Sequence, residues 1–216
     1  MDIDGLRRVD PQYRIQKGQI RFSRTEIIHI AIAVLVLSIA FTAILYRGSR
    51  LNDDEILNFV EIFAVALLLV VCSFMLHEFG HKFVAQRYNV WSEFRAYPSG
   101  LMIALLFSLV AGFLFAAPGA VYIRGDVSRE MNGKISLAGP AVNFAVAAVA
   151  MILCFSVGGF WGIIPMLMYL NAMLGLFNMI PILPFDGSKI FAWNKFAYAA
   201  MIAIGAAELA VYFLFV

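Results

Sequence analysis

Charged side chains are scarce in this sequence. Of its 216 residues only 14% are Asp, Glu, Lys or Arg, whereas 62% are hydrophobic. A soluble domain has about 25% charged residues. The shortage therefore excludes an ordinary soluble domain and indicates that lipid surrounds much of the chain.

Cysteine and histidine are also rare. The two cysteines, Cys72 and Cys154, both lie inside apolar runs, which argues against a disulfide and favours packed thiols. Of the three histidines, two fall within one five-residue segment. The third, His29, lies at the start of an apolar run, where an interfacial role is more common than metal binding. The sequence also lacks a soluble domain, a low-complexity linker and a clear internal repeat.

The sequence instead contains apolar runs near the length of a bilayer-spanning helix. They cover residues 27–46, 56–85, 101–117, 135–155, 161–183 and 196–216. A helix of about 20 residues crosses the hydrocarbon core. We therefore predict an all-α polytopic membrane protein with about five to six transmembrane helices, forming a single domain over residues 27–216.

Two mixed segments between the runs, residues 90–97 and 118–124, favour short membrane-associated β-strands. The N-terminal segment, residues 1–26, has a basic excess that predicts a cytosolic N-terminus. This basic segment is too long to be the start of a signal peptide, and no small-residue cleavage site follows it. Its mixed-in acidic residues and its neighbouring span argue for contact with lipid headgroups and against nucleic-acid binding.

One motif suggests metal chemistry: His77-Glu78-Phe79-Gly80-His81, inside the second run. Residues four apart lie on one helix face, so both imidazoles can bind one ion. Glu78 is offset around the helix and is better placed to hold a water and accept its proton. Gly80 leaves room for a neighbouring helix. An H-E-x-x-H can occur by chance, but these side chains are costly to bury in a membrane without a function.

A zinc site with three protein ligands leaves one position open for water, so a third ligand is needed. Pro181 and Pro184 prevent a regular helix and place Asp186 on irregular backbone at or inside the membrane. Asp-Gly is also a common turn pair, and Asp186 could simply cap a helix. Beside an intramembrane His-Glu-His motif, a ligand role is favoured.

At these residues the chain resembles the site-2 protease family of intramembrane zinc metalloproteases. The family's H-E-x-x-H matches the motif above. Its second signature, an Asn followed by spaced prolines and Asp-Gly, matches Asn178 through Gly187. Residues 139–143, Gly-Pro-Ala-Val-Asn, also resemble the Gly-Pro-x-x-Asn that opens a core helix in this family. The resemblance covers a catalytic core of about residues 59–190.

The resemblance implies one zinc ion per chain, held by His77, His81 and Asp186. It implies that Glu78 is the general base and that Asn178 stabilises the oxyanion or positions the scissile carbonyl. The implied function is regulated intramembrane proteolysis, in which a transmembrane helix of another membrane protein is cut. The extended segments could offer a strand edge to the opened substrate.

Three other functions remain open. A divalent-cation transporter also places His and Asp on membrane helices, although it has no need for Glu78 and paired repeats would be expected. The membrane proteases that process prenylated proteins share H-E-x-x-H, but their third ligand is a downstream Glu. A catalytically inactive relative could serve as a binding module, although the intact motif residues argue against it.

Topology gives the run at residues 101–117 a special role. If this run crossed the membrane, Asp186 would finish on the opposite side of the bilayer from His77, and bonds of about 2 Å could not reach both. We therefore predict a re-entrant segment, five full spans, an active site toward the cytosolic side and an external C-terminus. Lys82, Arg87 and other basic residues near the end of the second run fit this orientation.

Three polar residues inside the runs have structural interpretations. Asn143 and Asn171 are expected to form hydrogen bonds between helices. Glu208 is expected to be a paired or protonated structural residue.

Overall fold

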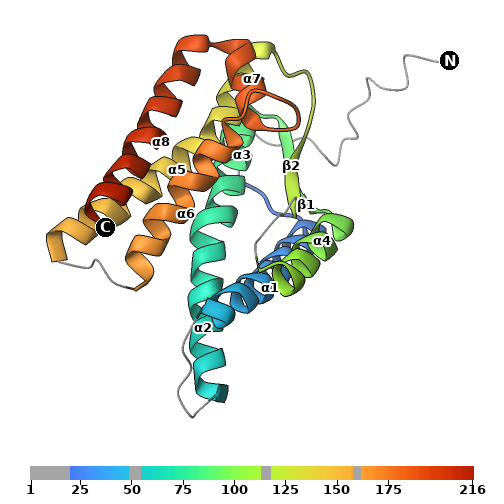
Figure 1. The fold of residues 1–216 in the computed structure, drawn as a ribbon. Helices are drawn as coiled ribbons and strands as arrows, with labels where there is room; N and C mark the ends of the chain where they lie inside the picture. The colour runs from blue at the N-terminus through green and yellow to red at the C-terminus, as the bar shows by residue number, and fades with distance from the viewer. Residues whose placement is uncertain (1–19, 49–54, 113–117, 158–161) are drawn as a thin grey trace.

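A computed structural model describes residues 20–48, 55–112, 118–157 and 162–216, so most of the predicted N-terminal segment lies outside the described residues (Figure 1). The elements are α1 (Arg24–Gly48), α2 (Glu55–Val70), the π-helical turn η3 (Val71–Met75), α3 (Leu76–Arg87), β1 (Trp91–Ala96), α4 (Pro98–Val110), β2 (Gly119–Arg124), α5 (Arg129–Val157), α6 (Ile163–Asn178), α7 (Asp186–Trp193) and α8 (Lys195–Phe215). The predictions of an all-α polytopic protein and of two short strands are confirmed.

Among the described residues, four helical stretches are long and apolar enough to cross a membrane. They are Arg24–Arg47, Phe59–Arg87, Arg129–Ser156 and Lys195–Phe215. Helices α4 and α6 are apolar but shorter. The helix in the predicted span 161–183 is shorter than the apolar run. It ends at Asn178, because Pro181 and Pro184 cannot donate backbone hydrogen bonds.

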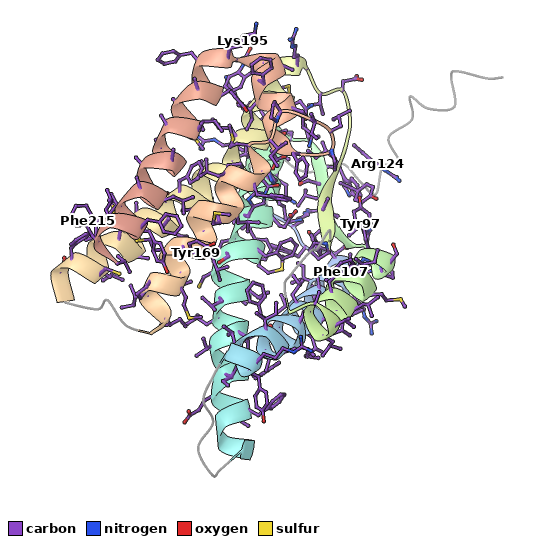
Figure 2. The ribbon with its side chains drawn as sticks, viewed as in Figure 1. Tyr97, Phe107, Arg124, Tyr169, Lys195 and Phe215 are labelled. Atoms are coloured by element: carbon purple, nitrogen blue, oxygen red, sulfur yellow. The ribbon has the colours of Figure 1, made fainter. Side chains whose placement is uncertain are left out.

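The helices form two groups on either side of a continuous rod made by α2, η3 and α3 (Figure 1). Helices α5, α6 and α8 lie on one side, and α1, α4 and the sheet lie on the other. A Cβ added at Gly80 of α3 would lie 2.8 Å from the Ala138 carbonyl oxygen of α5, so glycine permits this close approach. Helix α8 runs from Lys195, near α7, to Phe215, whose ring packs against that of Phe155 near the end of α5 (Figure 2).

Strands β1 and β2 pair antiparallel, with Ala96 opposite Gly119. Because these two residues pair, the chain leaves the sheet into α4 and returns to the same end of the sheet. The two ends of the segment that contains α4 thus lie together, as a re-entrant path for residues 101–117 requires; the path through the membrane stays a prediction, and residues 113–117 lie outside the described residues. The guanidinium of Arg47, at the end of α1, donates to the Leu109 and Val110 carbonyls at the C-terminus of α4. These carbonyls have no partner within their own helix and would be costly to leave bare in lipid.

Two buried clusters hold the sheet and α7 in place. The first joins α1, α2, β1 and α4 through Ala33, Leu37, Val70, Phe94, Leu101 and Ala104. The second joins α5, α7, α8 and the segment after α6 through Phe144, Met179, Ile190 and Met201. Both cysteines are free, as predicted. Lys82, one of the basic residues that predict a cytosolic end for the second run, has a fully buried side chain.

Candidate active site

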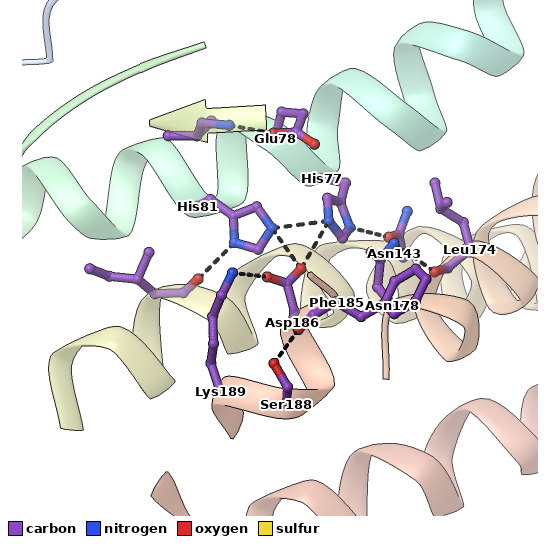
Figure 3. A network of polar contacts seen from close by, with 12 residues as sticks. His77, Glu78, His81, Asn143, Leu174, Asn178, Phe185, Asp186, Ser188 and Lys189 are labelled. Carbon is purple, nitrogen blue, oxygen red and sulfur yellow. Dashed lines mark hydrogen bonds and ion pairs between the residues drawn. The ribbon is translucent and has the colours of Figure 1, made fainter. Parts of the chain in front are cut away.

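Two histidines project from one face of α3 toward Asp186 at the start of α7 (Figure 3). The Nε2 atoms of His77 and His81 are 3.0 Å apart. Asp186 Oδ2 lies 3.4 Å from His77 Nε2 and 3.0 Å from His81 Nε2. The structure thus brings together the three residues that the sequence proposed as ligands.

Hydrogen bonds on the far side of each imidazole decide which ring nitrogen carries the proton. His77 Nδ1 lies 2.6 Å from Asn143 Oδ1, and His81 Nδ1 lies 2.8 Å from the carbonyl oxygen of Ile135. Both partners accept, since the amide nitrogen of Asn143 donates to two other oxygens. In neutral imidazoles each Nδ1 is therefore the donor, and each Nε2 keeps its lone pair.

Three electron-pair donors therefore converge on one point with no hydrogen between them. Ligands of a tetrahedral zinc with bonds of about 2.0–2.1 Å lie roughly 3.3 Å apart, close to the spacing of these atoms. Two imidazole nitrogens and one carboxylate oxygen also form the ligand set of a catalytic zinc site. Gly139 of α5 makes room for the rings, because a Cβ there would lie 2.7 Å from His77 Cε1 and closer still to the His81 ring. The residues present fit a bound metal ion.

Asp186 differs from the sequence expectation in its backbone. The irregular segment covers 179–185, and Asp186 is the first residue of α7, where the helix dipole favours a negative charge. Burial raises the pKa of the Asp186 carboxyl, but in the metal-free site, where the imidazoles can take up protons, the charges and hydrogen bonds of protonated His81 and His77 outweigh burial and hold that pKa well below its usual range. The carboxyl is therefore ionised, as metal binding requires.

Lys189 is a site residue that the sequence interpretation missed. Its Nζ lies 3.4 Å from Asp186 Oδ1, whereas Oδ2 of the same carboxylate faces the imidazoles. The two oxygens have different partners, which holds the carboxylate in one orientation. A basic residue three positions after an acid on a helix is the signal that could have identified it.

Glu78 lies apart from the three converging atoms, on the side of α3 that faces β2 (Figure 3). Its Oε2 accepts a hydrogen bond of 3.1 Å from the backbone N–H of Val121. A cavity of about 250 Å³ connects Glu78, the three clustered residues, Asn178 and the β2 backbone. Tyr97 also lines it; a hydrogen bond to Tyr122, together with burial, raises the pKa of Tyr97 to about 12, so this phenol stays neutral.

A protein of Methanocaldococcus jannaschii, provisionally named a zinc metalloprotease, is 42% identical to this chain over 185 residues. The match covers 83% of this chain and 90% of that protein. The chain belongs to the site-2 protease family. A zinc metalloprotease of the same organism is 29% identical over 76% of this chain, which spans 42% of that relative's length. A Mycolicibacterium smegmatis protein, also provisionally named a zinc metalloprotease, is 29% identical over 71% of this chain and 67% of its own length. No family model and no solved structure matches the chain.

The second signature of this family runs from Asn178 to Gly187. Its Asp, Asp186, is one of the three clustered residues, whereas its Asn, Asn178, is not. Asn178 lines the cavity, and its Nδ2 donates to the Leu174 carbonyl oxygen in α6 at 3.0 Å. An amide nitrogen carries two hydrogens, so one remains available to a ligand in the cavity.

The remaining polar candidates lie outside the cluster. Asn143 donates to Asn171 at 2.8 Å and thereby joins α5 to α6, which confirms the interhelical prediction. His29 accepts a hydrogen bond of 3.1 Å from the Ala96 N–H. Glu208 is buried in α8, and within the described part of the chain its Oε2 has no hydrogen-bond partner. Of the two predicted states, paired or protonated, this atom does not show the paired one, and the protonated one stays a prediction.

Proposed function

We propose that the protein is a zinc-dependent intramembrane endopeptidase that hydrolyses peptide bonds in transmembrane segments of other membrane proteins. The observation that carries the proposal is the convergence of His77, His81 and Asp186 beside a cavity that also holds Glu78. The two histidines and Glu78 lie on a helix that is long and apolar enough to cross a membrane. A carboxylate next to the ligands but outside them favours hydrolysis over cation transport, which requires ligands but no general base.

The chemistry divides among the residues of the cavity. A single zinc ion held by His77, His81 and Asp186 would act as a Lewis acid toward a peptide carbonyl and make water more acidic. Glu78 accepts a proton from the attacking water and passes it to the leaving amine. Asn178 offers its free amide hydrogen to the developing negative charge on the carbonyl oxygen.

The substrate must enter this cavity with its peptide bonds exposed. A helix hides its carbonyls in internal hydrogen bonds, so the cleaved segment has to open. Gly119, Ala120 and Val121 of β2 line the cavity, and an extended peptide could pair with the edge of this strand.

The function can be tested with purified protein in lipid vesicles that contain a single-span substrate. We expect a cut within the span, located by mass spectrometry of the products. Replacing helix-breaking residues near the cut with Leu should slow cleavage, because Leu stabilises the closed helix. Cleavage confined to soluble loops of the substrate would contradict the intramembrane assignment.

We also propose that the active site faces the cytosolic side. The first turn of α1 contacts both α3 and β1 near the site, since Glu26 binds Lys82 and the Phe94 N–H. The basic excess of residues 1–26 favours a cytosolic N-terminus, which supports a cytosolic location for this end of α1.

Cysteine labelling measures this orientation. Ser99 and Ser128 are exposed on the two sides of the re-entrant segment. Single Ser99→Cys and Ser128→Cys variants, in a background without Cys72 and Cys154, should both react with a membrane-impermeant reagent from the cytosolic side. Labelling of Ser128→Cys only from outside would exclude a re-entrant path.

Asn178 has its own expected phenotype. Asn178→Ala should keep the metal and lower the turnover number by a factor equivalent to about 2–4 kcal/mol, the usual effect of losing an oxyanion donor. Metal analysis and steady-state kinetics check this together. A change confined to KM would make Asn178 a substrate-binding residue instead.

A further inference from the structure

A second buried polar cluster joins α1, α3 and β1. Lys82 Nζ lies 2.8 Å from Glu26 Oε2, and both side chains are fully buried. The same Nζ donates to the Ser92 carbonyl oxygen at 3.0 Å and lies 4.5 Å from the ring centroid of Phe22. The other oxygen of Glu26 accepts from the Phe94 N–H at 2.8 Å. Buried charges are tolerated only with such complete pairing, so these contacts hold their elements firmly.

This cluster covers the outer edge of β1. One edge of β1 pairs with β2, and groups on the other edge bind side chains of α1 and α3. The Phe94 N–H binds Glu26, the Ala96 N–H binds His29, and the Ser92 carbonyl binds Lys82. A strand edge occupied in this way cannot accept another strand. On the outer edge of β2 the structure shows the Val121 N–H bound to Glu78, against three such contacts on β1, so the β2 edge is the more open of the two to a peptide.

The covered edge also sets where β2 lies. Phe94 is directly opposite Val121 in the sheet register. The Val121 N–H donates to Glu78, so it does not pair with β1. Glu26, Phe94, Val121 and Glu78 thus form a row across the sheet, with a carboxylate at each end. A shift of β1 away from α1 would carry the Val121 edge away from Glu78.

We propose that the two side chains that accept from the outer edge of β1, Glu26 and His29, are positioning residues for peptide cleavage, with Lys82 balancing the buried charge of Glu26. They hold the sheet against α3 so that the outer edge of β2 aligns an extended substrate beside Glu78. Neither is one of the three clustered ligand residues. This inference rests on the proposed protease function and adds the residues that set substrate alignment.

Two double variants test it as a matched pair. Glu26→Gln with Lys82→Met and Glu26→Leu with Lys82→Met both remove the two buried charges. Gln retains an oxygen that accepts from the Phe94 N–H, whereas Leu does not. Both variants should fold and keep their zinc. We expect kcat/KM of the Gln variant to stay within about threefold of the wild type and that of the Leu variant to fall about tenfold or more, because small misplacements of a reacting group are costly.

A distance measurement separates positioning from stability. Spin labels at Arg87→Cys in α3 and Arg124→Cys in β2, in a background without the two native cysteines, report where the sheet lies. The distance distribution should broaden in the Leu variant and remain narrow in the Gln variant. Equal cleavage and equal distances in the two variants would overturn the inference.

A milder change covers the case in which the double variants fail to fold. His29→Ala removes the acceptor of the Ala96 N–H without exposing a buried charge. It should lower kcat/KM several-fold with zinc unchanged, and unaltered kcat/KM would again overturn the inference. Failure of the protease assignment would look different, because the wild type itself would then cleave no membrane substrate.

Discussion

Glu78→Gln is expected to retain the bound metal and to lower cleavage by about 100-fold or more, the usual scale for loss of a general base. Gln has nearly the shape of Glu and can still accept the hydrogen bond from the Val121 N–H. It cannot take a proton from water at neutral pH. Metal analysis of the purified variant and its rate on a membrane substrate measure the two effects separately.

Glu208 supplies a matched control for this experiment. It is also a buried carboxylate in a helix long enough to span the membrane, but it lies in α8, outside the cavity. Glu208→Gln should leave both metal content and cleavage near the wild-type values. Loss of zinc together with activity in Glu78→Gln would show that Glu78 is a ligand and that its role is misassigned.

His81→Ala is expected to lose both the metal and all measurable cleavage. His77 and Asp186 would remain as only two ligands, and three protein ligands are typical of catalytic zinc sites. The Ile135 carbonyl, which accepts from the His81 ring and orients it, would also lose its donor. After dialysis, wild-type protein should contain about one zinc per chain and the variant less than about a tenth of that.

The third histidine is the control for this loss. His29 binds the Ala96 N–H and has no contact with the three ligand atoms. His29→Ala should therefore keep about one zinc per chain. Chelation of the wild type should reproduce the His81→Ala phenotype, and added zinc should restore cleavage only in the wild type. Full activity in His81→Ala would contradict the proposed metal site.

Local sequence patterns were sufficient for several features because the physics that causes them is short-ranged. Hydrophobic runs predict helices in lipid, since each helix satisfies its own backbone hydrogen bonds. The four-residue spacing of His77 and His81 places both on one face of α3. Pro181 and Pro184 predict the end of α6, because neither can donate a backbone hydrogen bond.

The contact of Asp186 with residues more than 100 positions earlier is encoded in no helix period. The need for a third zinc ligand favoured Asp186, and the family resemblance implied the same residue. The short strands were predicted from composition, but their antiparallel register, and hence the return of α4 to its starting point, was not.

Tertiary structure alone decided which side chains support the site. Asn143 and Ile135 set the protons of the two imidazoles, and Lys189 orients the Asp186 carboxylate. Lys82 appeared from the sequence to be one of several cytosolic charges, and Glu26 lay in the predicted basic segment. The two side chains are fully buried as a pair only because α1, α3 and β1 meet. This packing removes water from both charges, so each needs a well-placed partner. No local sequence pattern contains that information.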